Sequence, residues 1–168
     1  MDINLFDKNI ELVVKSAKDR FVIIKGGSDK VNRLAVSSKK VDILLDSHLG
    51  YRKDKMHQRD SGLNQVLCKL AKENNVAIGF SFSSILHSKN YRDLGRIIQS
   101  IKLCRKYKVK IVVGNFAKNK SDVREIKDVY SMFKVLGMTG MEIKASSEFI
   151  EGRLDYKKRY VSKGVRKI

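Results

Sequence analysis

The chain has 168 residues, of which 42% are apolar, so it is long enough for one domain with a substantial hydrophobic core. Lysine and arginine number 36 against 18 aspartates and glutamates, which gives a formal net charge of +18. Ordinary soluble domains are much nearer neutrality, and a compact fold with this charge repels itself unless a polyanion neutralises it. The favoured partner is therefore nucleic acid, and an anionic membrane surface is the second candidate.

Apolar runs alternate with amphipathic segments along the whole chain. Strands are expected to start near residues 2, 21, 41, 76, 109 and 141, with a helix after each. The strongest unit spans 106–138, where a β-branched run, a basic loop over 114–120 and an amphipathic helix ending at Gly137 follow one another. The predicted helices cover 8–19 and 91–107, or begin at Ser28, at Asp60 or Ser61, at Ser121 or Asp122, and after Ser147.

Strict alternation predicts an α/β fold with parallel strands and right-handed crossovers. A TIM-barrel-like closed or partly closed sheet and a doubly wound open sheet both satisfy this pattern. Six strands are fewer than the eight of a full barrel, and a partial barrel leaves a strand edge that a partner or the terminal segments must cover. We expect one barrel-like domain over 1–150, followed by a basic C-terminal tail over 151–168.

The cysteine and hydropathy patterns predict a cytoplasmic protein without a membrane-spanning segment, and we expect no membrane partner. Cys68 and Cys104 fall in amphipathic helix patterns, which is typical of small buried side chains in a reducing compartment. No apolar run approaches the ~20 residues that span a bilayer. Asp2 and Asp7 stand where a signal peptide would carry positive charge.

In either architecture, functional residues follow the carboxyl ends of the strands. That rim is polar and basic, and it carries few carboxylates. The three histidines form no His-x-His pair, and no Gly-x-Ser-x-Gly turn is present, so neither a metal centre nor a serine nucleophile is expected. The turn Lys25-Gly26-Gly27-Ser28 could bind one phosphate, although a tight strand-to-helix turn is the favoured interpretation.

RNA binding requires cations on one surface rather than a catalytic constellation, because phosphate contacts supply most of the affinity. Tyr51, Tyr91 and Phe116 are candidates for base stacking, and each could equally be a packing residue. The candidate RNA contacts on the rim, the loops and the long helix are Lys25, Arg52, Arg59, Arg92, Arg96, Lys120 and Lys144.

Short motifs over residues 20–147 occur in the order of a known family. This series resembles protein component 3 of archaeal ribonuclease P, which is related to a eukaryotic subunit of the same enzyme. The motifs are Gly26-Gly27 with Asn32-Arg33, Val41-Asp42-Ile43-Leu44, Asp60-Ser61-Gly62-Leu63-Asn64, Asn74-Asn75-Val76-Ala77-Ile78, Arg105-Lys106-Tyr107-Lys108-Val109, Ala117-Lys118 and Leu136-Gly137-Met138. Against the family, the chain is expected to lack a first strand and helix, and Gln65 replaces a histidine that often follows the asparagine.

The resemblance implies a barrel-like fold of the polymerase-and-histidinol-phosphatase superfamily without its metal ligands. It implies a subunit of a tRNA-processing endoribonuclease, a hydrolase in which the RNA, with Mg²⁺, removes the 5′ leader of precursor tRNA. The chain itself would carry no catalytic residue and no cofactor. It would bind and stabilise the ribonuclease P RNA together with protein component 2 and other subunits. Arg33 and Lys118 stand at family motif positions and are implied RNA contacts.

Two other function classes stay open. A metal-dependent phosphoesterase could use the same fold, although the missing His-x-His pair disfavours it. A generic RNA-binding or ribosomal protein would show the same excess of cations.

Overall fold

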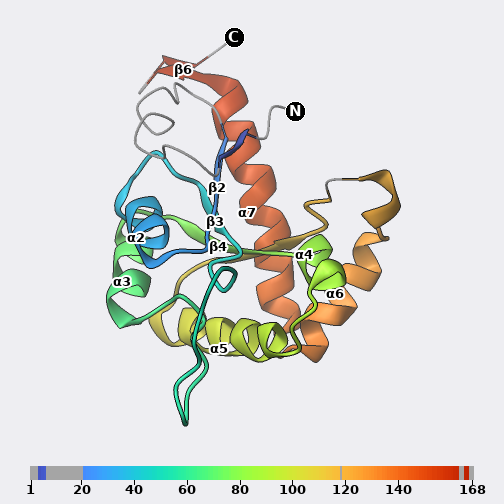
Figure 1. Cartoon of the computed structure of the whole chain (residues 1–168). Helices are drawn as coiled ribbons and strands as arrows, with labels where there is room; N and C mark the ends of the chain where they lie inside the picture. Colours follow the sequence, from blue (N-terminus) through green and yellow to red (C-terminus); the bar gives the residue numbers. More distant parts are fainter. Residues whose placement is uncertain (1–3, 7–20, 118, 163–164, 167–168) are drawn as a thin grey trace.

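The computed structural model of the chain describes residues 4–6, 21–117, 119–162 and 165–166. Its elements, shown in Figure 1, alternate as the sequence predicts for most of the chain. In chain order they are β1 (Asn4–Phe6), β2 (Val22–Lys25), α2 (Asp29–Ser37), β3 (Ile43–Leu45), α3 (Gln65–Glu73), β4 (Ala77–Ser81), α4 (Phe82–His87), α5 (Arg92–Tyr107), β5 (Ile111–Gly114), the 3-10 turn η1 (Lys120–Asp122), α6 (Ile126–Val135), α7 (Gly140–Arg159), β6 (Tyr160–Ser162) and β7 (Val165–Arg166). The helix predicted over 8–19 lies outside the described residues.

The described sheet is parallel, and its order is β1-β2-β3-β4-β5. A doubly wound sheet reverses its strand order at a switch point, whereas each strand here pairs with the next one along the chain. Sequential order is how the wall of a TIM barrel is built. The barrel-like alternative is therefore confirmed, as an open parallel wall.

Both faces of this wall are buried, because successive strand residues point to opposite sides. Helices α2, α3, α5 and α6 cover one face, on which the strands place Val22, Ile24, Leu44, Ile78, Phe80, Ile111 and Val113. Helix α7 covers the other with Phe149, which packs in one cluster with Ile23, Ile43, Leu45, Ala77 and Val112. Figure 1 shows strands β2, β3 and β4 between α2 and α3 on one side and α7 on the other.

The strand predicted over 141–145 is wrong, because these residues form the start of α7. Thr139 and Glu142 make a reciprocal capping box: the Glu142 N–H donates to Thr139 Oγ1 at 3.2 Å, and the Thr139 N–H donates to Glu142 Oε2 at 2.8 Å. Ile143, Ser146 and Phe149 are buried at helical spacing. The alternation of apolar and polar residues over 141–145 was too short to distinguish the two periods.

Two predicted helix starts are also corrected. Helix α3 is capped by Asn64, whose side chain accepts from the Leu67 N–H at 2.9 Å, rather than by Asp60 or Ser61. Helix α6 begins at Ile126, and Asp122 lies in η1 instead of capping it. Ser28, in contrast, caps α2 as predicted. Among the described helices, none is long and apolar enough to cross a membrane.

Candidate nucleic-acid interface

The loops at the carboxyl ends of β2 and β3 are joined by one buried amide. Asn32, fully buried on α2, accepts from the Gly27 N–H at 3.1 Å and donates to the Ser47 and Gly62 carbonyls at 3.0 and 3.1 Å. A Cβ on Gly26 would lie 2.6 Å from Asn32 Oδ1, so only glycine lets the β2 loop approach this closely. These contacts hold the loops after β2 and β3 in place independently of the surface cations.

Arg52 joins the same loops from the other side. Its side chain is only 4% exposed, and Nη1 lies 2.9 Å from Asp29 Oδ1 and 3.1 Å from Asp60 Oδ1. Its other nitrogens donate to the carbonyls of Gly27 and Leu49. The guanidinium predicted to contact RNA is therefore enclosed by the protein's own acceptors.

Arg96 is enclosed in the same way. Its side chain is 3% exposed; Nε donates to Asp54 Oδ1 at 3.0 Å and Nη1 to Asp93 Oδ1 at 3.1 Å, while Nη2 donates to the Arg52 carbonyl. In the helical pattern of α5, Arg96 falls opposite the apolar face, and the loop over 50–60 covers that side. Burial opposes ionisation of Asp54, yet hydrogen bonds from the Asp60 N–H, Arg59 and Arg96 outweigh it and lower its pKa to about 2.

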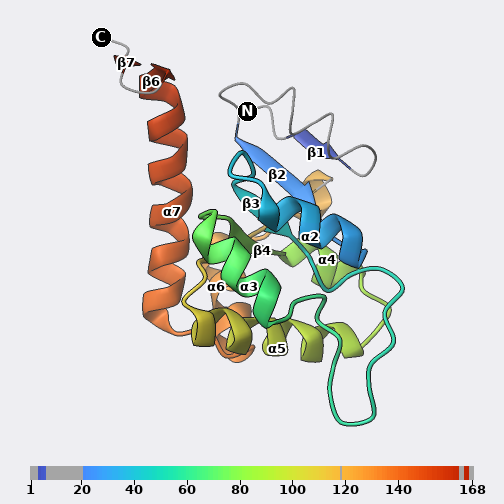
Figure 2. The same ribbon diagram turned by 90° about the vertical axis from the view of Figure 1, so that its left-hand side faces the viewer.

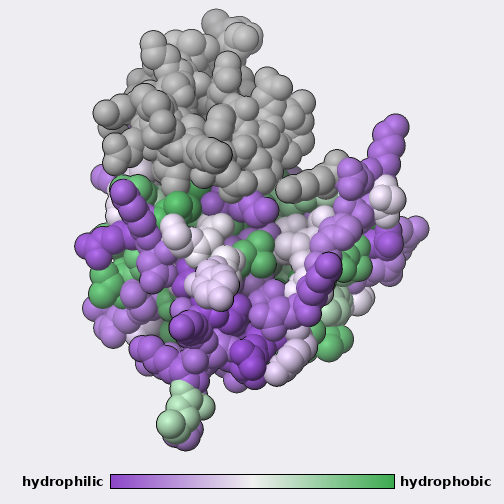
Figure 3. Space-filling model, in the orientation of Figure 1, coloured by the Kyte–Doolittle hydropathy of each residue, from purple (hydrophilic) through white to green (hydrophobic). Residues whose placement is uncertain are grey.

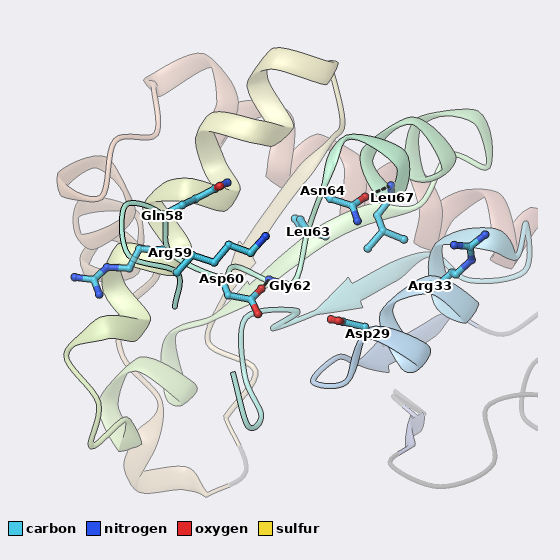
Figure 4. A pocket seen from close by; sticks show the side chains of 10 residues that line it. Asp29, Arg33, Gln58, Arg59, Asp60, Gly62, Leu63, Asn64 and Leu67 are labelled. Carbon is cyan, nitrogen blue, oxygen red and sulfur yellow. Dashed lines mark hydrogen bonds between the residues drawn. The ribbon is translucent and has the colours of Figure 1, made fainter. Parts of the chain in front are cut away.

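A cavity of about 350 Å³ lies beside this loop and brings three cations together. Arg33 on α2 and Arg59 on the loop lie at opposite ends of it, with Asp60 between them (Figure 4), and Lys55 also lines it. Asp29 and Asp60 on its walls are both paired with Arg52. The cavity thus presents a surplus of positive charge and suits an anionic ligand such as a phosphate group.

A second cavity, of about 440 Å³, opens at the ends of β2 and β4 and is lined by Lys25, Ser81, Phe116 and Asn119, among others. His87 Nε2 lies 3.0 Å from Asp122 Oδ2 on its wall. That hydrogen bond lowers the pKa of Asp122. The sequence pattern does not predict this pair, because it assigns Asp122 to the start of a helix.

Two buried titratable groups follow β3. Burial raises the pKa of Asp46 to about 6, although its Oδ1 accepts from the Ser81 N–H at 2.9 Å. Burial likewise lowers the pKa of His48 to about 4. Within the described residues, no group of three or more His, Cys, Asp or Glu side chains is placed to hold a metal ion.

The remaining predicted contacts lie at the surface, apart from Lys118, which is outside the described residues. Arg92 starts α5, Lys120 belongs to η1, and both are exposed. Lys144 is on α7, 79% exposed and 3.9 Å from Glu148, so it does not follow a strand end. Lys55 was missed by sequence reasoning, which selected arginines in its loop; its proximity to Arg33 depends on the fold.

The family model and the sequence relatives give the same family. The model of the family described as RNase P subunit p30 matches residues 8–150. Ribonuclease P protein component 3 of Methanosarcina acetivorans is 34% identical over 152 residues, which are 86% of this chain and 60% of the relative. The protein of that name from Methanocaldococcus jannaschii is 31% identical over 122 residues, 71% of this chain and 50% of the relative. The chain thus spans 50–60% of the length of these relatives.

A chain in a cryo-EM structure of archaeal ribonuclease P with mature tRNA is similar to this fold, with a TM-score of 0.75 at 27% identity over 96% of this chain and 69% of that one. An amidohydrolase crystal structure has a TM-score of 0.53 at 14% identity, over 80% of this chain and 33% of that one, a likeness of fold alone. Because the family model covers most of its length, the chain belongs to the RNase P subunit p30 family.

Proposed function

We propose that the chain is a protein subunit of ribonuclease P, the ribonucleoprotein that removes the 5′ leader of precursor tRNA. In this assignment the chain binds the catalytic RNA in the cytoplasm and stabilises its active shape. The RNA, with Mg²⁺, carries out the hydrolysis. Protein component 2 and the other protein subunits are the proposed protein partners, and precursor tRNA is reached through the complex.

The observation that carries this proposal is the family membership, together with the similarity to a chain in an archaeal ribonuclease P structure. The electrostatics support it independently. The net charge of +18 favours a polyanionic partner, and the cavity lined by Arg33, Lys55 and Arg59 offers phosphate-binding groups.

The predicted contacts divide into two proposed roles. Direct phosphate contact suits Lys25, Arg33, Arg59, Arg92, Lys118, Lys120 and Lys144. Arg52 and Arg96 contribute indirectly, because their side chains are buried and their guanidinium groups are bound by carboxylates and carbonyls, whereas Arg59 stays partly exposed beside Asp54. They hold the loop over 50–60 in the shape that presents its other cations.

Reconstitution tests the proposal. Precursor tRNA cleavage is measured at limiting Mg²⁺ with the RNA and the other subunits, with and without this chain. We expect omission to lower the rate, and addition of the Val135→Ala variant, altered at an exposed α6 residue, to restore it. Unchanged cleavage without the chain would refute the proposal.

The alternatives give different results. A metal-dependent phosphoesterase would bind divalent metal and cleave a generic phosphodiester without RNA present. A generic RNA-binding or ribosomal protein would give equal footprints on ribonuclease P RNA and ribosomal RNA.

A further inference from the structure

The loop over residues 50–60 projects from the body of the protein (Figures 1 and 2). The Lys55 N–H donates to the Gln58 carbonyl at 2.8 Å and the Gln58 N–H to the Lys55 carbonyl at 3.3 Å, which closes the tip as a tight hairpin. Met56 at that tip is 92% exposed. Figure 3 shows the projection surrounded by largely hydrophilic surface.

The base of the loop is fixed by ion pairs. Asp54 accepts from Arg59 at 2.9 Å, from Arg96 at 3.0 Å and from the Asp60 N–H at 2.9 Å. Arg59 also lies against Gly95 of α5, where an added Cβ would meet its Nε at 3.3 Å. The loop is therefore preorganised on α5, which lowers the entropy cost of any contact that it makes.

Both carboxylates of the loop over 50–60 are bound by arginines, whereas its two lysines have no carboxylate partner among the described residues. Asp54 and Asp60 pair with Arg96 and Arg52. Across the part of the chain that the structure describes, neither Lys53 nor Lys55 forms a salt bridge, and both residues are exposed. The exposed charges of the loop over 50–60 are consequently cationic.

Two exposed tyrosines adjoin this loop: Tyr51 belongs to it, and Tyr91 directly precedes α5, on which the loop packs. Tyr51 is 101% exposed and Tyr91 75%. Tyr91 precedes α5 and takes no part in capping it, because the side chain of Asn90 accepts from the Arg92 N–H at 3.1 Å. The guanidinium of Arg92 lies 5.7 Å from the centre of the Tyr91 ring. Exposed rings beside cations are the elements of a surface that binds single-stranded nucleic acid.

We propose that Tyr51, Lys53, Lys55, Tyr91 and Arg92 form a platform that binds an unpaired RNA strand. Bases stack on the two tyrosine rings while the three cations contact phosphates. A-form duplex fits less well, because its base faces are covered by neighbouring pairs. This inference rests on the proposed function, within which it assigns the platform to an unpaired segment of the ribonuclease P RNA.

The test measures binding of the full chain to three probes: ribonuclease P RNA, an unstructured single strand of about twelve nucleotides, and a duplex of the same length. Tyr51→Ala and Tyr91→Ala should each weaken single-strand binding by about 5- to 150-fold with the salt slope unchanged, since stacking releases no counterions. Lys53→Ala and Lys55→Ala should each lower that slope by roughly 0.7. Tyr51→Phe and Tyr91→Phe keep the ring and should bind as the parent does, as should Val135→Ala, which truncates an 82% exposed side chain elsewhere.

Three outcomes would overturn the platform: tyrosine variants that bind the single strand normally, equal losses on strand and duplex, or intact RNA binding with lost assembly onto a protein subunit. Failure of the proposed function is seen separately. In that case the unmodified chain neither binds ribonuclease P RNA nor supports cleavage, whatever the tyrosine variants do on the short strand.

Discussion

The Ser146 hydroxyl on α7 accepts a hydrogen bond from the Val113 N–H on β5 at 2.9 Å. Among the described strands β5 pairs with β4 alone, so this N–H points away from the sheet at its outer edge. An open wall of parallel strands was expected to need such a cover, and α7 supplies it. A side-chain oxygen thus takes the place of a further strand.

Ser146→Ala should therefore lower the free energy of unfolding by about 1–3 kcal/mol, because it leaves a buried N–H without an acceptor. Urea unfolding measures the change. Ser131→Ala is a matched control, since that exposed hydroxyl bonds only to the Lys127 carbonyl within α6. If the two variants are equally stable, the edge contact has no energetic role.

Gly62 and Gly152 should respond in opposite ways to alanine. Gly62 has φ +72°, and its added Cβ would lie 2.1 Å from the Ser47 carbonyl oxygen and 2.6 Å from Arg52 Nη2, so Gly62→Ala should cost about 3 kcal/mol or more. Gly152 is inside α7 with nothing within 4 Å of an added Cβ, so Gly152→Ala should stabilise by up to about 1 kcal/mol. Thermal unfolding of both variants checks the pair; a stable Gly62→Ala protein would contradict the rim geometry.

Asp46 should make stability fall as pH rises. Burial raises its native pKa to about 6 from an ordinary value of 3.8, so the native state holds a proton that the unfolded chain releases. Its stabilising contribution is complete below pH 3.8 and is lost as pH rises through about 6. Asp46→Asn keeps the acceptor for the Ser81 N–H and tolerates the φ of 53°.

The Asp46→Asn variant should accordingly gain roughly 3 kcal/mol at neutral pH and little at pH 4. Parent and variant are compared by urea unfolding at both pH values, which cancels the contribution of His48 because both proteins retain it. An equal difference at the two pH values would exclude a titrating Asp46.

Arg33→Ala should affect RNA binding and Arg96→Ala should affect the free energy of unfolding. Arg33→Ala removes an exposed cation from the 350 Å³ cavity, so it should lower the salt slope of RNA binding by roughly 0.7–0.9 while changing stability by less than about 0.5 kcal/mol. Arg96→Ala removes the buried cation shared by Asp54 and Asp93, leaves Asp93 without an arginine and Asp54 with Arg59 alone, and should cost roughly 3–5 kcal/mol in unfolding free energy. An unchanged slope for Arg33→Ala would exclude a phosphate contact there.

Local patterns were sufficient for much of the wall. The β-branched run before Gly114, the cap at Ser28 and the left-handed Gly137 each follow from a few adjacent residues, and all three are present. Charge counting likewise selected the loop over 51–59. The motif from Asp60 to Asn64 is identified by resemblance alone. Its structural role depends on Gly62, which packs against the Ser47 carbonyl and accepts from the Asn32 side chain.

The errors share a cause, which is that long-range contacts overrode local preference. Arg96 meets Asp54, 42 positions away in the chain, and helical spacing cannot reveal that partner. Asp122 is held by His87 from another helix, so it does not serve as the cap that its neighbours suggest. At 141–145 the short alternating pattern predicts a strand, but the capping box of Thr139 and Glu142 starts a helix there.

The position of α7 also has a consequence for the order of folding. Adjacent strands follow one another along the chain, whereas Phe149 shares a cluster with Ile23, and Arg153 lies 3.7 Å from Asp42, each more than 100 residues earlier in the sequence. Closing contacts of such separation carries the largest loop entropy. Docking of α7 should therefore come late in folding, and Phe149→Ala should accelerate unfolding more than it slows refolding.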